Sequence, residues 1–158
     1  ALLTPGWIGD DTNMNIGTIT GGKANNIVPD TCIVTGEVRS LDHEKALRII
    51  DQIRDTFMEQ AGDARVEFIL DPHLVAYHIP EDSALVQRFK RACEKVGLPG
   101  RLISTLGGSD NNILLLHGLT GIVLSCGMYS VHSTREYTYE DDLVKGAALA
   151  AELLISEE

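Results

Sequence analysis

The hydrophobic pattern of this chain changes at Pro80, and that change limits the folds that the sequence can adopt. Before Pro80, the apolar residues predict strands at residues 16–20 and 31–40, then a helix, then a strand at residues 65–70 with residues 74–79 as its candidate continuation. Strand, strand, helix, strand is the order of a small α+β sheet that carries helices on one face.

After Pro80 the order is helix, strand, helix, strand, helix, which is half of a layered α/β sheet with an open edge. The predicted segments are helix 85–96, strand 102–106, short helix 111–117, buried strand 122–126 and helix 143–154. The predicted fold class is therefore α/β, with an α+β domain over residues 1–79 and part of a layered α/β domain over residues 80–158.

The strand at residues 31–40 has a polar working face that carries Thr35, Glu37 and Arg39. Asp42 is expected to cap the helix that follows, and Gly62 is expected to stop it. The buried stripe of that helix is predicted to be Ala46, Ile50, Ile53 and Phe57.

At the C-terminal end, Thr138 and Asp141 resemble a capping box. The predicted buried stripe of the last helix is Leu143, Ala147, Ala150 and Leu154. At the other end, residues 1–11 contain a Pro-Gly break and begin no obvious strand or helix, so this segment reads as the end of a longer element.

The charge balance excludes several classes of partner. The chain has 13 basic and 23 acidic residues, a formal net charge of −10, and no cluster of Lys or Arg that could follow a phosphate backbone. No apolar run approaches the roughly 20 residues of a membrane span, and no signal-peptide pattern begins the sequence. We expect a cytoplasmic protein that binds neither nucleic acid nor membranes.

The cysteines and most of the histidines carry no metal-ligand spacing. Cys32, Cys93 and Cys126 are far apart, lie in apolar runs, and are predicted to be buried reduced thiols. The remaining histidines, interpreted as surface or core residues, are His43, His73, His78 and His117. The chain also lacks the motifs of serine hydrolases, P-loop enzymes, Rossmann dehydrogenases and His-Glu-x-x-His peptidases.

The Gly-Gly-Ser-Asp sequence at residues 107–110 follows a predicted strand and precedes a predicted helix. Backbone N–H groups in such a turn could receive a carboxylate or another anion. A turn whose Ser109 or Asp110 caps the helix explains the same residues without a ligand. The pair Asn25 and Asn26 is first of all a turn by composition.

His132 follows the predicted buried strand by a short loop, where open α/β sheets place their functional sites. Its imidazole could bind zinc, act as a base or fill a pocket, and spacing alone favours a structural histidine. Glu136 could orient the His132 ring, or could be an acidic residue favoured near a helix start.

Four motifs occur in order along the chain: residues 15–30, 36–42, 107–110 and 132–137. The first two resemble the lid domain of peptidase T-like zinc metallopeptidases, and the last two resemble the final motifs of that family's catalytic domain. In that family the lid pairs with its twin in a homodimer, and two zinc ions per subunit activate a water that attacks a peptide bond.

The resemblance implies roles for particular residues. His132 would be the final zinc ligand, and Asn26 and Arg39 would contact a small peptide substrate across the dimer, with Gly108 and Ser109 as further substrate contacts. A guanidinium suits a peptide carboxylate because its fork binds both oxygens. For Arg39, a cross-strand pair with an acidic neighbour is the alternative interpretation.

The sequence also departs from the family pattern. The other zinc ligands and the general base belong to motifs that do not occur here, so no catalytic residue is assigned. Because His132 alone cannot hold a catalytic zinc, we predict a C-terminal portion of such a peptidase, inactive in isolation. The alternatives are a dimerisation module and a metal-free small-ligand binding domain that uses the turn at residues 107–110.

Overall fold

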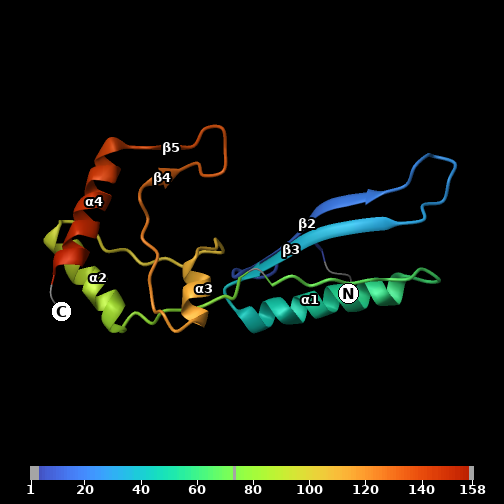
Figure 1. The fold of residues 1–158 in the computed structure, drawn as a ribbon, viewed down its shortest axis with the longest axis horizontal. Helices are drawn as coiled ribbons and strands as arrows, with labels where there is room; N and C mark the ends of the chain where they lie inside the picture. The colour runs from blue at the N-terminus through green and yellow to red at the C-terminus, as the bar shows by residue number, and fades with distance from the viewer. Residues whose placement is uncertain (1–3, 73, 157–158) are drawn as a thin grey trace. The chain divides into compact units, whose positions relative to one another are not determined.

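A computed structural model describes residues 4–72 and 74–156 (Figure 1). The chain divides into two compact units, Ala1–Tyr77 with Ser104–Gly108, and His78–Ile103 with Ser109–Glu158. Helices and short strands are mixed in the α/β fold class that the sequence predicts. Within the described ranges, no helix combines the length and apolar character needed to cross a bilayer. His73 lies outside the described residues.

The first unit contains a three-stranded antiparallel sheet in the order β1-β2-β3. Its strands are β1 (Gly6–Trp7), β2 (Thr12–Gly21) and β3 (Cys32–Ser40), so both predicted strands are confirmed. The interpretation of residues 1–11 as beginning no element is wrong, because Gly6 and Trp7 pair with Met14 and Asn13 of β2.

A β-bulge at Gly17 sets which side chains share a face of the sheet. Ile16 pairs with Gly36, but the next paired residues are Thr18 and Thr35, so β2 has one more residue than β3 at this point. The extra residue brings Ile19 to the face that carries Met14.

The opposite face of the β2–β3 ribbon is polar, as predicted for β3. It carries Asn13, Asn15, Thr18, Thr20, Thr35, Glu37 and Arg39, together with the apolar Ile33 opposite Thr20. The hydroxyls of Thr18 and Thr35 lie 2.6 Å apart across the ribbon.

Helix α1 (His43–Gln60) begins at the predicted cap, where the Asp42 side chain accepts a hydrogen bond from the Lys45 backbone N–H at 3.0 Å. Gly62 follows the helix end with a φ of +59°, which favours glycine. Ala46 and Ile49 of the helix are buried, as is Met14 of β2. The core of this unit is therefore small and lies at the start of α1.

Polar groups around the buried Thr12 join β2, β3 and α1 at one end of the sheet. Thr12 is fully buried, and its hydroxyl lies 3.0 Å from Asp11 Oδ1 and 2.7 Å from Ser40 Oγ. Asp11 also accepts a hydrogen bond from Lys45 of α1, and this bond holds the pKa of the Asp11 carboxyl below its usual range. The hydrogen bond from Thr12 lowers that pKa further.

The second unit packs α2 (Ala84–Lys95) against α4 (Glu140–Ile155), with α3 (Asn111–Leu116) between them in sequence. Its core is Phe89, Ala92, Cys93 and Leu149. Ser83 caps α2 by accepting from the Val86 N–H at 3.4 Å, and Arg88 Nη2 donates to the Leu153 carbonyl of α4 at 2.6 Å. The predicted helices at residues 85–96 and 111–117 are therefore confirmed.

The predictions for the start and the buried face of α4 are wrong. Its N-cap is Tyr139, without a side-chain cap, so Thr138 and Asp141 form no capping box. The predicted stripe of Leu143, Ala147, Ala150 and Leu154 is exposed, whereas Leu149 is buried and Leu153 packs beside it. Because α4 is apolar on most sides, its sequence does not fix which face meets α2.

Four predicted strand segments do not form strands in the described part of the chain. These segments are residues 65–70, 74–79, 102–106 and 122–126. A strand exists only through a hydrogen-bonded neighbour, and no described segment supplies a ladder beside any of them. The second unit instead has a short antiparallel ribbon of β4 (Met128–Tyr129) and β5 (Tyr137–Thr138).

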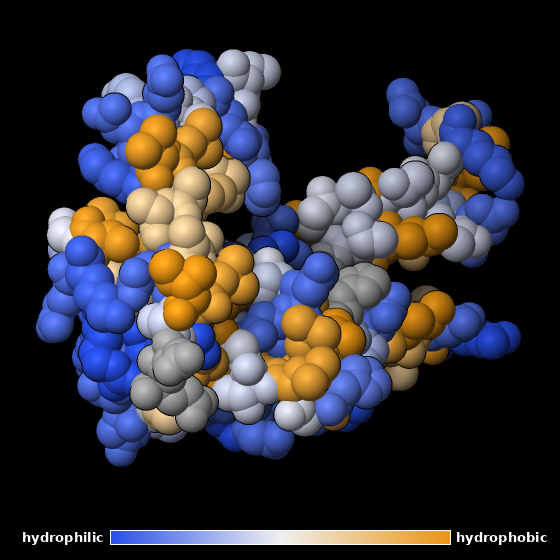
Figure 2. Space-filling model, turned by 60° about the vertical axis from the view of Figure 1, so that its left-hand side comes forward, coloured by the Kyte–Doolittle hydropathy of each residue, from blue (hydrophilic) through white to orange (hydrophobic). Residues whose placement is uncertain are grey.

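All three cysteines are free, as predicted, but only Cys93 is buried, and burial raises the pKa of its thiol. Cys32 and Cys126 are exposed, because the apolar runs around them are themselves exposed. Figure 2 shows hydrophobic side chains gathered in several patches on the surface that it displays. Among the most exposed are Val28, Ile69, Ile103 and Leu154.

Candidate functional site

The polar face of β3 holds an arginine in a fixed orientation. Arg39 Nε donates to Glu37 Oε1 at 2.9 Å, and Arg39 Nη2 donates to Glu37 Oε2 at 3.0 Å. Both side chains are about half exposed, at 50% and 53%. The acidic partner of Arg39 therefore lies on the same strand, two residues away, and is not the cross-strand neighbour of the alternative interpretation.

The same guanidinium contacts the segment before the glycine turn. Arg39 Nη1 donates to the Leu106 carbonyl at 3.4 Å. In this unit, Gly108 packs against Leu74 so closely that a methyl group on Gly108 would overlap the Leu74 side chain. Of the predicted substrate residues, the structure thus brings Arg39 close to the segment that ends at Gly108.

The glycine turn uses two of its own N–H groups internally. Gly107 N–H donates to Thr105 Oγ1 at 3.1 Å, and Ser109 N–H donates to Asn112 Oδ1 at 2.9 Å. Asp110 is the N-cap of α3 but makes no side-chain cap bond, so neither Asp110 nor Ser109 caps this helix in the predicted way. These two N–H groups are therefore engaged before any anion arrives.

Asn111 and Asn112 fix α3 to its surroundings. Both side chains are buried, and Asn111 Nδ2 donates to the Gly121 carbonyl at 3.0 Å. A methyl group on Gly121 would overlap the Asn111 amide, so this contact requires glycine. Neither asparagine was predicted to have a role, because only the folded chain shows that these amides are buried and hydrogen-bonded.

Asn26 lies in the β2–β3 hairpin connection, in the turn that its composition predicts. The Ile27 N–H donates to the Ala24 carbonyl at 3.2 Å, and Lys23 Nζ pairs with Asp30 Oδ2 at 2.9 Å across the loop. The Lys23 hydrogen bond lowers the pKa of the Asp30 carboxyl. Asn26 is thus presented on an ordered loop tip, at the end of the hairpin opposite Arg39.

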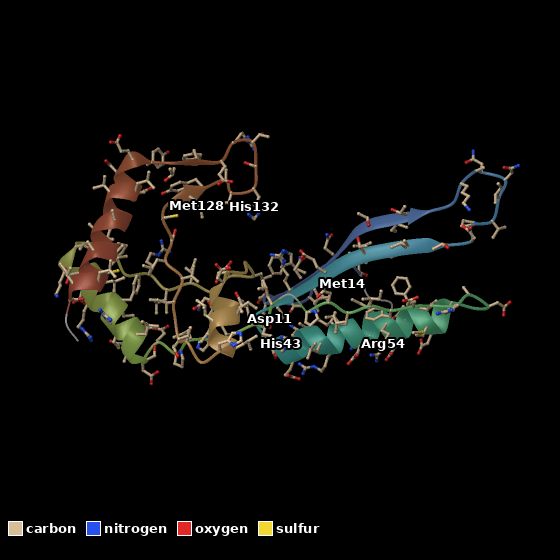
Figure 3. All side chains as sticks on the ribbon, viewed as in Figure 1. Asp11, Met14, His43, Arg54, Met128 and His132 are labelled. Atoms are coloured by element: carbon tan, nitrogen blue, oxygen red, sulfur yellow. The ribbon has the colours of Figure 1, made fainter. Side chains whose placement is uncertain are left out.

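His132 lies on the loop that joins β4 to β5 (Figure 3). Its φ of +61° and the φ of +49° at Ser130 are in the left-handed region, which non-glycine residues rarely adopt. Unusual backbone angles persist where the surroundings hold them, and they concentrate at functional sites. The loop is therefore a candidate site on backbone grounds as well as by its sequence motif.

Three hydrogen bonds that involve side chains hold this loop, besides a backbone bond from the Glu136 N–H to the Ser133 carbonyl at 3.1 Å. Glu136 Oε2 accepts from the His132 backbone N–H at 2.8 Å, Ser133 Oγ donates to the Ser130 carbonyl at 2.7 Å, and the Arg135 N–H donates to Ser133 Oγ at 3.1 Å. Glu136 thus contacts the backbone of His132, whereas the prediction was that it could orient the imidazole ring.

Aromatic side chains support the ribbon at the base of the loop. Tyr129 and Tyr137 stack with centroids 5.1 Å apart, and Tyr139 packs edge-on against both. Tyr129 Oη donates to Asp142 Oδ2 of α4 at 2.9 Å, a bond that raises the pKa of the Tyr129 hydroxyl. A hydrogen bond with Tyr139 likewise raises the pKa of Tyr137. An open cavity of about 480 Å³ beside this cluster is lined by Tyr129, Tyr139, Glu140, Asp141, Asp142 and Lys145.

The donor set around His132 does not by itself fit a catalytic zinc. Such an ion needs three protein ligands and an open position. Among residues 4–72 and 74–156, no group of three or more His, Cys, Asp or Glu side chains could hold a metal ion. His132 supplies one imidazole, which is fewer donors than such an ion needs.

Comparisons with known proteins find relatives along most of the chain. Residues 8–65 match the M20 family model described as a peptidase dimerisation domain. The chain is 30% identical over 151 residues to the Bacillus subtilis (strain 168) protein YqjE, covering 94% of the chain and 41% of that protein. It is 23% identical over 141 residues to an N-carbamoyl-L-amino-acid amidohydrolase of Pseudomonas sp. (strain NS671), covering 89% and 34%.

Two solved structures share the fold along almost the whole chain. A tripeptidase from Staphylococcus aureus superposes with a TM-score of 0.87 at 28% identity, covering 94% of this chain and 40% of that one. Aminopeptidase PepT from Bacillus cereus superposes with a TM-score of 0.81 at 30% identity, covering 96% and 41%. This chain therefore spans about two fifths, or less, of the length of these relatives. The chain is thus similar to part of M20-type peptidases: residues 8–65 match the dimerisation-domain model, and its fold matches part of a tripeptidase and of an aminopeptidase.

Proposed function

We propose that the chain is part of a zinc-dependent aminopeptidase that hydrolyses small peptides, tripeptides first among them. Residues 1–79 would form its lid and residues 80–158 the C-terminal part of its catalytic domain. The observation that carries the proposal is the oriented guanidinium of Arg39, which lies beside the segment leading to Gly108. The printed activities of the two structural neighbours, a tripeptidase and an aminopeptidase, support the substrate class.

Each proposed site residue has a distinct task. Arg39 would bind the substrate carboxylate, because its fork matches two carboxylate oxygens. Gly108 and Ser109 would contact the substrate backbone, and Asn26 of a second copy would reach the substrate across the proposed dimer. His132 would be one ligand of a dinuclear zinc site, on the loop that Glu136 holds through the backbone.

The remaining zinc ligands and the general base would lie in another part of the longer protein, because His132 supplies only one donor. The chain alone is therefore expected to be inactive. Robust tripeptide cleavage by the purified chain, abolished by a chelator, would contradict this expectation.

The proposal is tested by steady-state kinetics on the longer protein loaded with zinc. Trialanine is compared with an N-carbamoyl amino acid, the substrate class in the name of the amidohydrolase relative. A preference for the tripeptide supports the proposal. Hydrolysis of the N-carbamoyl amino acid alone would replace it with an amidohydrolase, and hydrolysis of neither would overturn it.

We also propose a homodimer formed through the first unit. The match of residues 8–65 to a peptidase dimerisation domain supports it, and β3 is an edge strand that could pair with a second copy. Sedimentation that finds a well-folded monomer at high protein concentration would count against the dimer.

The metal-free ligand-binding alternative predicts saturable binding of a carboxylate at the turn of residues 107–110. The internal hydrogen bonds of Gly107 and Ser109 disfavour it, and a flat calorimetric titration of the chain with acetate or trialanine would remove it.

The free thiols of Cys32, Cys93 and Cys126 suit a reducing compartment, so our proposal includes a cytoplasmic location.

A further inference from the structure

Glu37 occupies one edge of the Arg39 guanidinium and leaves another edge open. An arginine side chain carries five N–H donors in a rigid planar fork. Glu37 takes the Nε–H and one Nη2–H, at 2.9 and 3.0 Å, and the Leu106 carbonyl takes one Nη1–H at 3.4 Å. One N–H on Nη1 and one on Nη2 remain, which is the number that a bidentate carboxylate needs.

The neighbours of Arg39 on the sheet make it the cationic group of this face. In the β2–β3 register, Asn13 lies opposite Arg39 and Asn15 lies opposite Glu37. The other residues of this face are the uncharged Thr18, Thr35, Thr20 and Ile33. A carboxylate that approaches this face therefore meets one positive charge, the Arg39 guanidinium, whose orientation is set by its hydrogen bonds to Glu37.

We propose that Glu37 is a positioning residue that sets the angle of Arg39, so that the free Nη1 and Nη2 donors receive the carboxylate of the peptide substrate. This inference rests on the proposed function of Arg39. Both Glu37 and Arg39 are about half exposed, so solvent screens the charge of Glu37 and its geometric effect dominates.

Glu37→Gln separates orientation from charge. Glutamine has almost the shape of glutamate but only one acceptor oxygen, and its NH₂ group would face an arginine N–H. The fork then loses one of its two hydrogen bonds and the guanidinium is free to turn. If Glu37 merely neutralised Arg39, the same substitution would strengthen carboxylate binding.

The test uses the longer zinc-loaded protein with trialanine and with trialanine amide, which lacks the carboxylate. For trialanine, Glu37→Gln is expected to raise KM about tenfold, the effect of one hydrogen bond to a charged group, with kcat unchanged. For the amide, KM is expected to stay as in the wild type. In an Arg39→Ala background, Glu37→Gln is expected to have no further effect.

Asp51→Asn is the matched control, because Asp51 forms a similarly exposed pair with Arg54 on α1, with Asp51 Oδ1 and Arg54 Nη1 2.8 Å apart. It should leave both KM values unchanged. A lower KM for trialanine in Glu37→Gln, an equal change for acid and amide, or an undiminished effect in the Arg39→Ala background would each overturn the inference.

Calorimetric binding of the same two ligands separates failure of this inference from failure of the proposed function. Binding that favours the acid, with the preference lost in Glu37→Gln but without hydrolysis, would remove the peptidase proposal and keep the role of Glu37. If the wild type hydrolyses trialanine and Glu37→Gln leaves the preference for the acid unchanged, the peptidase proposal stands and the role of Glu37 is removed. Absence of both hydrolysis and acid-selective binding would overturn both.

Discussion

Gly36 lies on β3 opposite Ile16, where the Asn15 carbonyl oxygen occupies the space that a side chain would need. The obstacle is backbone, so no change of side-chain rotamer can relieve it. One residue further on, the ribbon carries Glu37, whose carboxylate holds Arg39. The orientation of this pair therefore depends on a close backbone approach that only glycine permits.

Gly36→Ala is expected to destabilise the chain by about 1–3 kcal/mol, the usual cost of forcing an extra methyl group into a packed position. Gly146→Ala is the control, and its expected change in the free energy of unfolding has the opposite sign. A methyl group at that α4 position meets nothing within 4 Å. Replacing a helical glycine there should stabilise by about 0.5–1 kcal/mol. Urea unfolding measures both, and equal effects of the two variants would contradict the close approach at Gly36.

The Asp11–Lys45 pair predicts a dependence of stability on pH. The Lys45 hydrogen bond lowers the folded-state pKa of Asp11. The pair therefore contributes fully to the free energy of unfolding above the ordinary aspartate pKa of about 3.9. This contribution is lost as the pH falls through the lowered folded value. Asp11→Asn should therefore reduce the free energy of unfolding at pH 7, with the difference from the wild type shrinking below pH about 4. A difference that stays constant down to pH about 2 would contradict this account.

The family resemblance made Arg39 and His132 candidate site residues, but it gave no indication of the groups that hold them. Spacing alone places Arg39 on a polar strand face and His132 after an apolar run, and it favours a structural role for the histidine. The Leu106 carbonyl that contacts Arg39 lies 67 residues away in sequence, a separation that no local pattern encodes. Glu136 accepts from the backbone N–H of His132, whose φ lies in the left-handed region. The local sequence does not predict this backbone conformation.

At the scale of elements, helices were predictable and the later strands were not. Helices α1 and α2 form from local contacts, and their caps at Asp42 and Ser83 lie within the same few residues. Strands at residues 65–70, 102–106 and 122–126 would require partners distant in sequence, which the described residues do not provide. In α4, apolar residues on most sides left the buried face undetermined.

The β4–β5 loop gives a prediction at this scale. Glu136→Ala removes the acceptor of the His132 N–H and should weaken zinc binding to the longer protein by about 10- to 100-fold. Glu136→Gln keeps an acceptor oxygen and should bind zinc nearly as well as the wild type. Competition with a chelator measures both affinities. A loss in Glu136→Gln as large as in Glu136→Ala would show that the charge, and not the backbone contact, is what matters.

At the scale of the whole molecule, the chain exposes more solvent-accessible surface than folded domains of the same total mass would. The chain exposes 12269 Å². Two separate domains of half its mass would expose about 9,400 Å² together, so about 2,900 Å² is in excess. Apolar side chains contribute to the exposed surface in both units, including Ile19 at 70% and Ile155 at 74% exposed. Large exposed apolar areas mark surfaces that another protein segment covers.

Leu154 on α4 tests this interpretation, because it is 84% exposed and yet apolar. In the isolated chain, Leu154→Lys should change stability by no more than about 0.5 kcal/mol, as at other surface positions. In the longer protein, where we expect α4 to be covered, it should cost about 2 kcal/mol or more. Parallel denaturant titrations measure both values, and equal small effects would mean that this face of α4 stays exposed.

The most direct test of the account compares tripeptide hydrolysis by the zinc-loaded longer protein with hydrolysis by its His132→Ala variant, with the metal content of both measured. The account predicts wild-type cleavage that a chelator abolishes and zinc restores, and a variant that has lost both activity and bound zinc. A His132→Ala variant that keeps its zinc and cleaves trialanine at the wild-type rate would contradict it.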